Sequence, residues 1–297
     1  MSHATTLDRA TTPGSRVPGP RGHLLWGMLP ELRRDMLGLY QRTAQEYGDI
    51  VRLRFLWVNT YAINSPDGIK RVLQDNNRNY IKGQFINNIL KLGLGENLLT
   101  TDGESWLTRR RLMQPAFHRQ RIAGFGAAMT DASQLMLQRW HELPAGAQLD
   151  MEEQTMAVTL RIAGQTLFSV DLLGEARALG HAFTCLSEYV NYRMQTPFPP
   201  PLFVPTAQNR RFKQALQTID QTVQAIIDER RRHGGEHHDL LSMLMEARDA
   251  DTGEAMNDAQ LRNEIVLMMF AGHETTATTL TWALYELARH PEEEAKL

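Results

Sequence analysis

Two periodicities in the hydrophobic and polar positions divide the chain. In one short run, 51–55, apolar residues alternate with arginines, which is the pattern of a half-buried strand, and a second strand is expected at about 60–64. We expect these runs to pair as a hairpin. In most of the remaining chain, apolar residues recur at helical spacing, and helices are predicted at 29–47, 66–75, 104–114, 120–141, 151–168, 175–193, 206–233, 238–248 and 258–289. The pattern therefore predicts a mainly α fold with a small N-terminal β-sheet.

Proline and glycine interrupt this pattern in two places. The segment 1–22 ends in Val17-Pro18-Gly19-Pro20-Arg21-Gly22, a composition that blocks helices and strands, so we expect a flexible leader. Prolines between Gln195 and Pro205 exclude regular structure there as well. No internal repeat and no linker-like tract divides the rest of the chain, so residues 23–297 are predicted to form a single mainly helical domain.

Charge and cysteine content narrow the class of protein. The formal net charge is −2, so no overall field favours nucleic acid or an anionic membrane as a partner. The single cysteine, Cys185, cannot form an internal disulfide, and we expect an ordinary buried thiol. The longest apolar run, Ile265–Gly272, is too short to span a bilayer, and 1–22 does not resemble a signal peptide or membrane anchor. These features predict a cytoplasmic protein with no membrane anchor and no nucleic-acid partner.

The last predicted helix is the most informative segment. Asn257 is a good N-cap, and Gln260 has the spacing of a capping box. The helical pattern then continues to Arg289, where Pro291 ends it, which gives a length of roughly 48 Å. Because residues 265–270 are all apolar, we expect this helix to be central and buried.

The middle of this helix reads Ala271-Gly272-His273-Glu274-Thr275-Thr276. Glu274 is costly to bury unless it is paired or solvated, and the Thr275 hydroxyl can bond the carbonyl of Ala271 one turn earlier. Small residues, a hydroxyl and a carboxylate thus lie together in the middle of the helix, where the small side chains leave room for a pocket. The alternative is an ordinary buried helix whose threonines bond backbone carbonyls. A zinc-protease motif is excluded because Ala277 stands where the second histidine ligand belongs.

Two motifs carry a resemblance to a known family. The run 271–276, followed by Thr281-Trp282-Ala283 and His290-Pro291-Glu292, resembles the distal long helix of cytochrome P450 enzymes. Upstream, Gly95-Glu96-Asn97-Leu98-Leu99 and Asp102-Gly103-Glu104-Ser105-Trp106, continuing to Arg110, Arg111 and Pro115-Ala116-Phe117-His118, resemble the family's Trp-x-x-x-Arg helix. The leader, the strand pair and the helix after Pro66 follow in the family's order. The resemblance implies a cytochrome P450-like fold of the soluble, bacterial type.

The resemblance also implies that the chain holds only the N-terminal portion of such an enzyme. The family's cysteine ligand lies in Phe-x-x-Gly-x-x-x-Cys-x-Gly, far downstream of the long helix, and no such segment occurs here. Cys185 stands in a different context, so no metal ligand is expected in this chain. The axial cysteine is expected beyond Leu297, and the chain would end in the helix after the long one.

As an activity, the resemblance implies a heme-dependent monooxygenase that inserts one oxygen atom of O2 into an apolar organic substrate, such as a fatty acid or terpenoid. The cofactor would be heme b, and the electrons would come from NAD(P)H through a ferredoxin- or flavodoxin-type redox protein. Thr275 would hydrogen-bond the oxygen and Glu274 would help to relay protons, while Ala271 and Gly272 would leave room. Two alternatives stay open: a non-catalytic truncated product that cannot hold heme, and an unrelated helical binding protein.

The second motif supplies the other site residues. Trp106 and Arg110 are four residues apart on a predicted helix, so both can face a heme propionate; a core tryptophan beside a surface arginine is the alternative. Apolar residues before this helix would cap the substrate pocket or lie in the core: Phe85, Ile86, Ile89 and Leu90. Neighbouring arginines would form a docking patch for an acidic electron donor or a solvated face: Arg109, Arg111, Arg119 and Arg121. The segment alone is expected to be inactive and, with an unpartnered apolar helix, poorly soluble.

Overall fold

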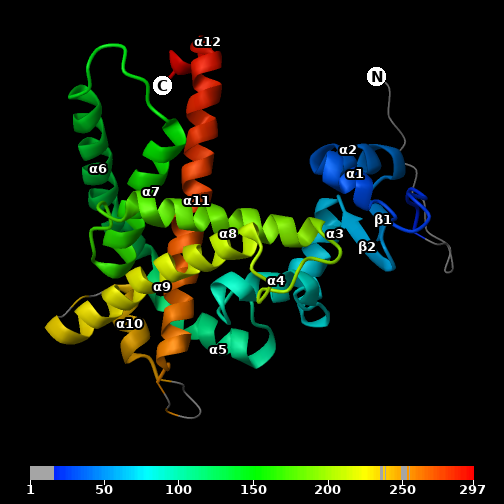
Figure 1. Cartoon of the computed structure of the whole chain (residues 1–297), viewed down its shortest axis with the longest axis horizontal. Helices are drawn as coiled ribbons and strands as arrows, with labels where there is room; N and C mark the ends of the chain where they lie inside the picture. Colours follow the sequence, from blue (N-terminus) through cyan, green and yellow to red (C-terminus); the bar gives the residue numbers. More distant parts are fainter. Residues whose placement is uncertain (1–16, 235–236, 238, 249–252, 254) are drawn as a thin grey trace, which may run out of the picture. The chain divides into compact units, whose positions relative to one another are not determined.

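A computed structural model describes residues 17–234, 237, 239–248, 253 and 255–297. It is mainly helical with one small sheet, as the hydrophobic pattern predicts (Figure 1). The chain forms two compact units, one up to Ile81 and one over Lys82–Leu297. Residues 1–16 of the predicted leader lie outside the described residues. Among the described helices, none combines the length and apolar character that a membrane crossing requires.

The first unit contains the predicted hairpin. Its elements are α1 (Leu29–Arg34), α2 (Met36–Tyr47), β1 (Ile50–Phe55), β2 (Val58–Ile63), α3 (Pro66–Lys70), the π-helix η1 (Arg71–Asp75) and the 3-10 helix η2 (Asn77–Asn79). β1 and β2 are antiparallel, with Val51 opposite Ala62. Buried Val51 and Leu53 of β1 pack with Leu39 of α2 and with Met28, which makes the core of this unit. The alternation in 51–55 therefore correctly identified the buried face.

The predicted helix 29–47 is wrong at one position, because it is interrupted at Asp35. This residue leaves the helical conformation, with φ −159° and ψ 85°, and becomes the N-cap of α2. Its carboxylate accepts hydrogen bonds from the backbone N–H of Gly38 at 2.9 Å and from Arg42 at 2.8 Å. Aspartate is among the best N-cap residues, so the break has a local cause that hydrophobic periodicity does not report.

The second unit is built from helices around α11. Its elements are α4 (Gln84–Leu94), α5 (Gly103–Met113), the 3-10 helix η3 (Gln114–Phe117), α6 (Arg119–His141), α7 (Met151–Phe168), α8 (Ala176–Gln195), α9 (Ala207–His233), α10 (Leu240–Glu246), α11 (Asp258–Arg289) and α12 (Pro291–Glu294). Helix α4 was not predicted, although its apolar residues recur at helical spacing. The proline-rich segment between α8 and α9 is irregular, as expected.

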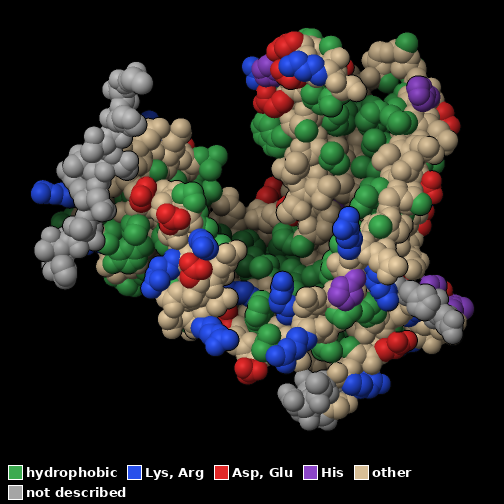
Figure 2. All heavy atoms as spheres, turned by 180° about the vertical axis from the view of Figure 1, so that it is seen from behind, with side chains coloured by type: hydrophobic (Ala, Val, Ile, Leu, Met, Phe, Trp, Pro, Cys, Tyr) green, Lys and Arg blue, Asp and Glu red, His purple; other side chains and the backbone are tan. Residues whose placement is uncertain are grey.

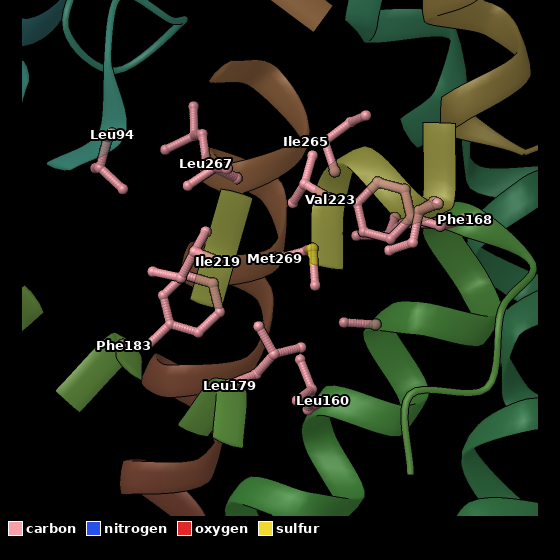
Figure 3. Close-up of a cluster of buried hydrophobic side chains, with 14 of the residues drawn as sticks. Leu94, Leu160, Phe168, Leu179, Phe183, Ile219, Val223, Ile265, Leu267 and Met269 are labelled. Carbon is pink, nitrogen blue, oxygen red and sulfur yellow. The ribbon is translucent and has the colours of Figure 1, made fainter. Parts of the chain in front are cut away.

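Helix α11 is the centre of this unit. Its capping box forms as predicted, with Asn257 and Gln260 each bonded to the other's backbone N–H. Ile265, Val266 and Met269 are fully buried, which confirms that this stretch is central. Side chains from α7, α8, α9 and α11 point toward one another in the core (Figure 3), including Leu160, Phe183, Val223 and Met269.

The burial of α11 ends midway along the helix. Ala277 is fully buried, but Trp282 is 61% exposed and Tyr285 is 49% exposed. Leu280 and Leu284 are also exposed. Hydrophobic side chains are visible at the surface of this unit in Figure 2. The first half of α11 is therefore a core helix, and its second half presents apolar side chains to solvent.

Candidate functional site

The two predicted members of the Trp-x-x-x-Arg motif lie together on α5. The guanidinium carbon of Arg110 is 5.6 Å from the centroid of the Trp106 ring, a cation–π contact. Trp106 is partly buried and Arg110 is exposed. Within the described part of the chain, the Arg110 guanidinium makes no ion pair or hydrogen bond. It is therefore a cation held by an aromatic ring and free to bind an anion.

Lys82 is a third member of this face, which the sequence analysis missed. Its Nζ lies 5.9 Å from the Trp106 ring centroid and donates hydrogen bonds to the carbonyls of Leu98 at 2.9 Å and Thr101 at 2.7 Å. Burial lowers the pKa of Lys82, while the nearby Asp102 carboxylate opposes that change. An arginine fork, an ammonium group and an aromatic ring make a donor set that fits a carboxylate-bearing group such as a porphyrin.

On α11, the predicted bond between Thr275 and Ala271 is present. The Thr275 hydroxyl donates to the Ala271 carbonyl at 2.8 Å, and both residues are exposed on the same face. The following threonine, Thr276, bonds Gly272 in the same way at 3.3 Å. This geometry agrees with both interpretations of the motif, because each one predicts threonines bonded to carbonyls. Ala271 and Thr275 thus lie at the surface of α11, near the middle of the helix where its burial ends.

Gly272 lies at the interface with α7. A Cβ added there would be 3.7 Å from the Cβ of Ala163 and 3.8 Å from Cδ1 of Leu167, which are ordinary contact distances. Gly272 therefore lies close to α7, while Ala271 and Thr275 are exposed.

Glu274 has the partner that its position in a helix centre requires. Its Oε1 accepts a hydrogen bond of 2.7 Å from the hydroxyl of Ser187 in α8. Burial raises the pKa of the Glu274 carboxyl, the Ser187 bond lowers it, and the charge of Glu152 raises it further. A carboxyl group with a raised pKa beside an exposed hydroxyl is suited to hold and release a proton.

His273, between these residues, faces the core. It is fully buried, its ring centroid is 4.9 Å from that of Phe183, and its Nδ1 lies 2.8 Å from the Met269 carbonyl oxygen. Burial lowers the pKa of His273, which favours the neutral ring. Its Nε2 has no hydrogen-bond partner among the described residues. His273 is therefore a core side chain, whereas Thr275 is exposed.

The four predicted pocket residues all lie on α4 but divide between two environments. Phe85 is 65% exposed and Ile86 is 44% exposed. Ile89 is buried, and Leu90 packs against the core cluster. The first turn of α4 thus presents apolar side chains to solvent, and the later residues anchor the helix.

The prediction that Arg109 belongs to a surface arginine cluster is wrong, because this residue is buried. Its side chain is only 10% exposed, and its Nη1 donates to Oε1 of Glu264 in α11 at 2.6 Å. It cannot belong to a docking patch or a solvated face, because its charge is neutralised inside the protein. Arg111 and Arg119 are exposed, as expected. Cys185 is buried within α8, which confirms its interpretation as an ordinary core thiol.

Comparison with known proteins identifies the family. The cytochrome P450 family profile matches residues 17–297, and the chain belongs to that family. It is 33% identical over 281 residues to cyclooctat-9-en-7-ol 5-monooxygenase of Streptomyces melanosporofaciens, covering 91% of this chain and 59% of that protein. Cyclooctatin synthase of the same organism is 33% identical over 253 residues, covering 84% and 54%.

A third relative is pentalenene oxygenase of Streptomyces avermitilis, which is 32% identical over 293 residues, covering 98% of this chain and 62% of that protein. The chain therefore spans between 54% and 62% of the length of these three relatives.

Proposed function

We propose that the protein is a heme-dependent monooxygenase that inserts one atom of O2 into an apolar organic substrate. Membership of the cytochrome P450 family supports this activity. Two relatives are named as oxygenases of cyclooctat-9-en-7-ol and pentalenene, which favours a terpenoid over a fatty acid as substrate. The single observation that carries the proposal is the exposed Arg110 guanidinium over the Trp106 ring, without a counter-ion among the described residues.

In this proposal, Arg110 and Lys82 bind the propionates of heme b from the α5 face, and the Trp106 ring orients Arg110. When bound through a cysteine thiolate, heme supplies the activation of dioxygen. Cys185 does not fit as that ligand, because it is buried in α8. We propose that the axial cysteine lies outside residues 1–297.

The residues of α11 act on the other side of the proposed site. The Thr275 hydroxyl can turn from the Ala271 carbonyl and donate its proton into the open space that Ala271 and Gly272 leave. Glu274 holds a proton at its raised pKa and exchanges it with solvent through the Ser187 side of the helix. The exposed first turn of α4, with Phe85 and Ile86, contacts the apolar substrate, while Ile89 and Leu90 hold that helix in place.

Electrons would come from NAD(P)H through a ferredoxin- or flavodoxin-type protein that docks at exposed arginines such as Arg111 and Arg119. A cytoplasmic location stays a prediction from the sequence. A truncated product without heme is the remaining alternative.

A reduced carbon monoxide difference spectrum of the full-length protein tests the proposal. The red-shifted Soret band of a thiolate-ligated heme is the expected result. A purified, folded full-length protein that binds no heme would contradict it.

A further inference from the structure

Glu264 is a fully buried carboxylate that joins three segments of the second unit. It lies on α11, about two turns before Ala271, and is 0% exposed. Its Oε1 accepts from Arg109 of α5 at 2.6 Å. Its Oε2 accepts from the backbone N–H of Leu98 at 3.2 Å, in the segment between α4 and α5. One side chain of α11 therefore holds both α5 and the segment that precedes it.

Stability alone does not account for this pair. A buried ion pair loses several kcal/mol of hydration per ion, and apolar residues of similar volume often replace such a pair without loss. Such a pair can instead contribute conformational specificity, because few arrangements satisfy both charges. Glu264 and Arg109 thus fix how α5 lies against α11.

Glu264 constrains the two cations of the proposed propionate-binding face, Arg110 and Lys82, in two ways. Arg110 follows Arg109 and points about 100° further around the α5 axis, so anchoring Arg109 fixes the direction of Arg110. The N–H of Leu98 is bonded to Glu264, while its carbonyl accepts from the Nζ of Lys82 at 2.9 Å. Arg110 is therefore the sequence neighbour of one residue bonded to Glu264, and Lys82 is hydrogen-bonded to another, Leu98.

The segment before α5 has little freedom to adopt another position. Gly95 ends α4 with φ +71°, and a Cβ there would collide with the Asn263 side chain of α11. The Asn263 amide also donates to the Glu96 carbonyl at 3.2 Å. The contact of this segment with α11 is thus made by the two successive residues Asn263 and Glu264.

We propose that Glu264 is a positioning residue, which sets Arg110, Trp106 and Lys82 at a fixed place relative to the Ala271–Thr275 face of the same helix. This inference rests on the proposed function, since it assigns a purpose to the cations of the α5 face. Glu264 itself touches neither cofactor nor substrate.

The test compares Glu264→Gln with Arg110→Gln in the full-length protein. Two quantities are measured: the affinity for heme and the resonance Raman bending band of the heme propionates, which reports their hydrogen bonds. Glu264→Gln is expected to weaken heme binding by about 10-fold or more, as is typical of residues that orient a ligand's partners. It should also move the propionate band in the same direction as Arg110→Gln.

The matched control is Asp220→Asn. Asp220 of α9 also pairs with an arginine of α11, Arg262, but it is 52% exposed. Its loss is expected to leave both quantities unchanged. An unchanged band and affinity in Glu264→Gln, with both changed in Arg110→Gln, would overturn the inference and leave the proposed function intact. No change in Arg110→Gln would count against the proposed function itself.

If Glu264→Gln does not fold, the double variant Glu264→Met with Arg109→Met removes both charges at once. Its melting temperature is expected to return to within a few degrees of the parent, because no unpaired charge is left buried. Its propionate band should still be displaced. A parent-like band and affinity in this variant would show that the pair is merely structural.

Discussion

The hydroxyl of Ser187 in α8 donates a hydrogen bond of 2.7 Å to the carboxylate of Glu274 in α11. This bond favours the ionised form of Glu274 and so lowers its pKa, whereas burial of the carboxyl group raises it. Ser187 of α8 therefore lowers the pKa of Glu274, the proposed proton-relay residue on α11.

Ser187→Ala is expected to raise the pKa of Glu274 further. One hydrogen bond contributes about 1 kcal/mol, so the increase is less than about one pH unit. The pH profile of product formation by the full-length protein should move to higher pH by that amount. Thr184→Ala is the control, because its hydroxyl bonds only the Gly180 carbonyl of α8. Identical profiles for Ser187→Ala and the parent would contradict this assignment.

Thr275→Ala is expected to uncouple electron consumption from product formation. Without the Thr275 hydroxyl the proposed proton donor is lost, so product per NAD(P)H should fall several-fold while NAD(P)H consumption continues. Thr275→Ser should keep most of the coupling. Thr279→Ala removes a hydroxyl one turn later, bonded to the Thr275 carbonyl at 2.8 Å, and should behave like the parent. Equal coupling in Thr275→Ala and the parent would refute the role.

The two ends of α4 should respond differently to truncation. Ile89→Ala removes a buried side chain and is expected to lower the free energy of unfolding by about 2–5 kcal/mol. Phe85→Ala should change it by no more than about 0.5 kcal/mol, because the ring is 65% exposed. Phe85→Ala should instead weaken substrate binding, measured as the substrate-induced change in the heme spectrum. An unchanged substrate affinity would exclude Phe85 from the pocket.

Asp239 is expected to make the fold acid-sensitive. Burial would raise its pKa, but bonds from Arg230, the Ser242 N–H and Ser169 lower it from 3.8 to about 2. The folded state thus binds fewer protons than the unfolded one, so the stabilisation is present above about pH 4 and is lost as pH falls toward 2. It amounts to about 2 kcal/mol.

Unfolding by denaturant at several pH values measures this effect. The parent should lose more stability on acidification than Asp239→Asn does. Asp258→Asn, which removes an exposed partner of Arg231, should follow the parent. Equal acid sensitivity in the parent and Asp239→Asn would rule out this contribution.

Local signals in the sequence predicted much of the site. The capping box of α11, the Thr275–Ala271 bond and the shared face of Trp106 and Arg110 each involve residues three or four apart on one helix. Helical spacing alone is enough to place such pairs.

The missed partners are distant in sequence. Ser187 lies 87 residues from Glu274, and Glu264 lies 155 residues from Arg109. Arg109 was expected at the surface because arginine is rarely buried without a partner, and its partner is supplied only by the tertiary fold. Lys82 was missed for the same reason, since no helical spacing links it to Trp106.

The proposed binding of the heme carboxylates by the α5 face can be tested directly with two neighbouring arginines. Arg110 lies over the Trp106 ring, while Arg111, the next residue, is exposed and lies outside this contact. Heme affinity of the full-length protein is measured for Arg110→Gln and Arg111→Gln. We expect a loss of affinity of about 10-fold or more in Arg110→Gln and none in Arg111→Gln. Equal affinities in both variants and the parent would contradict it.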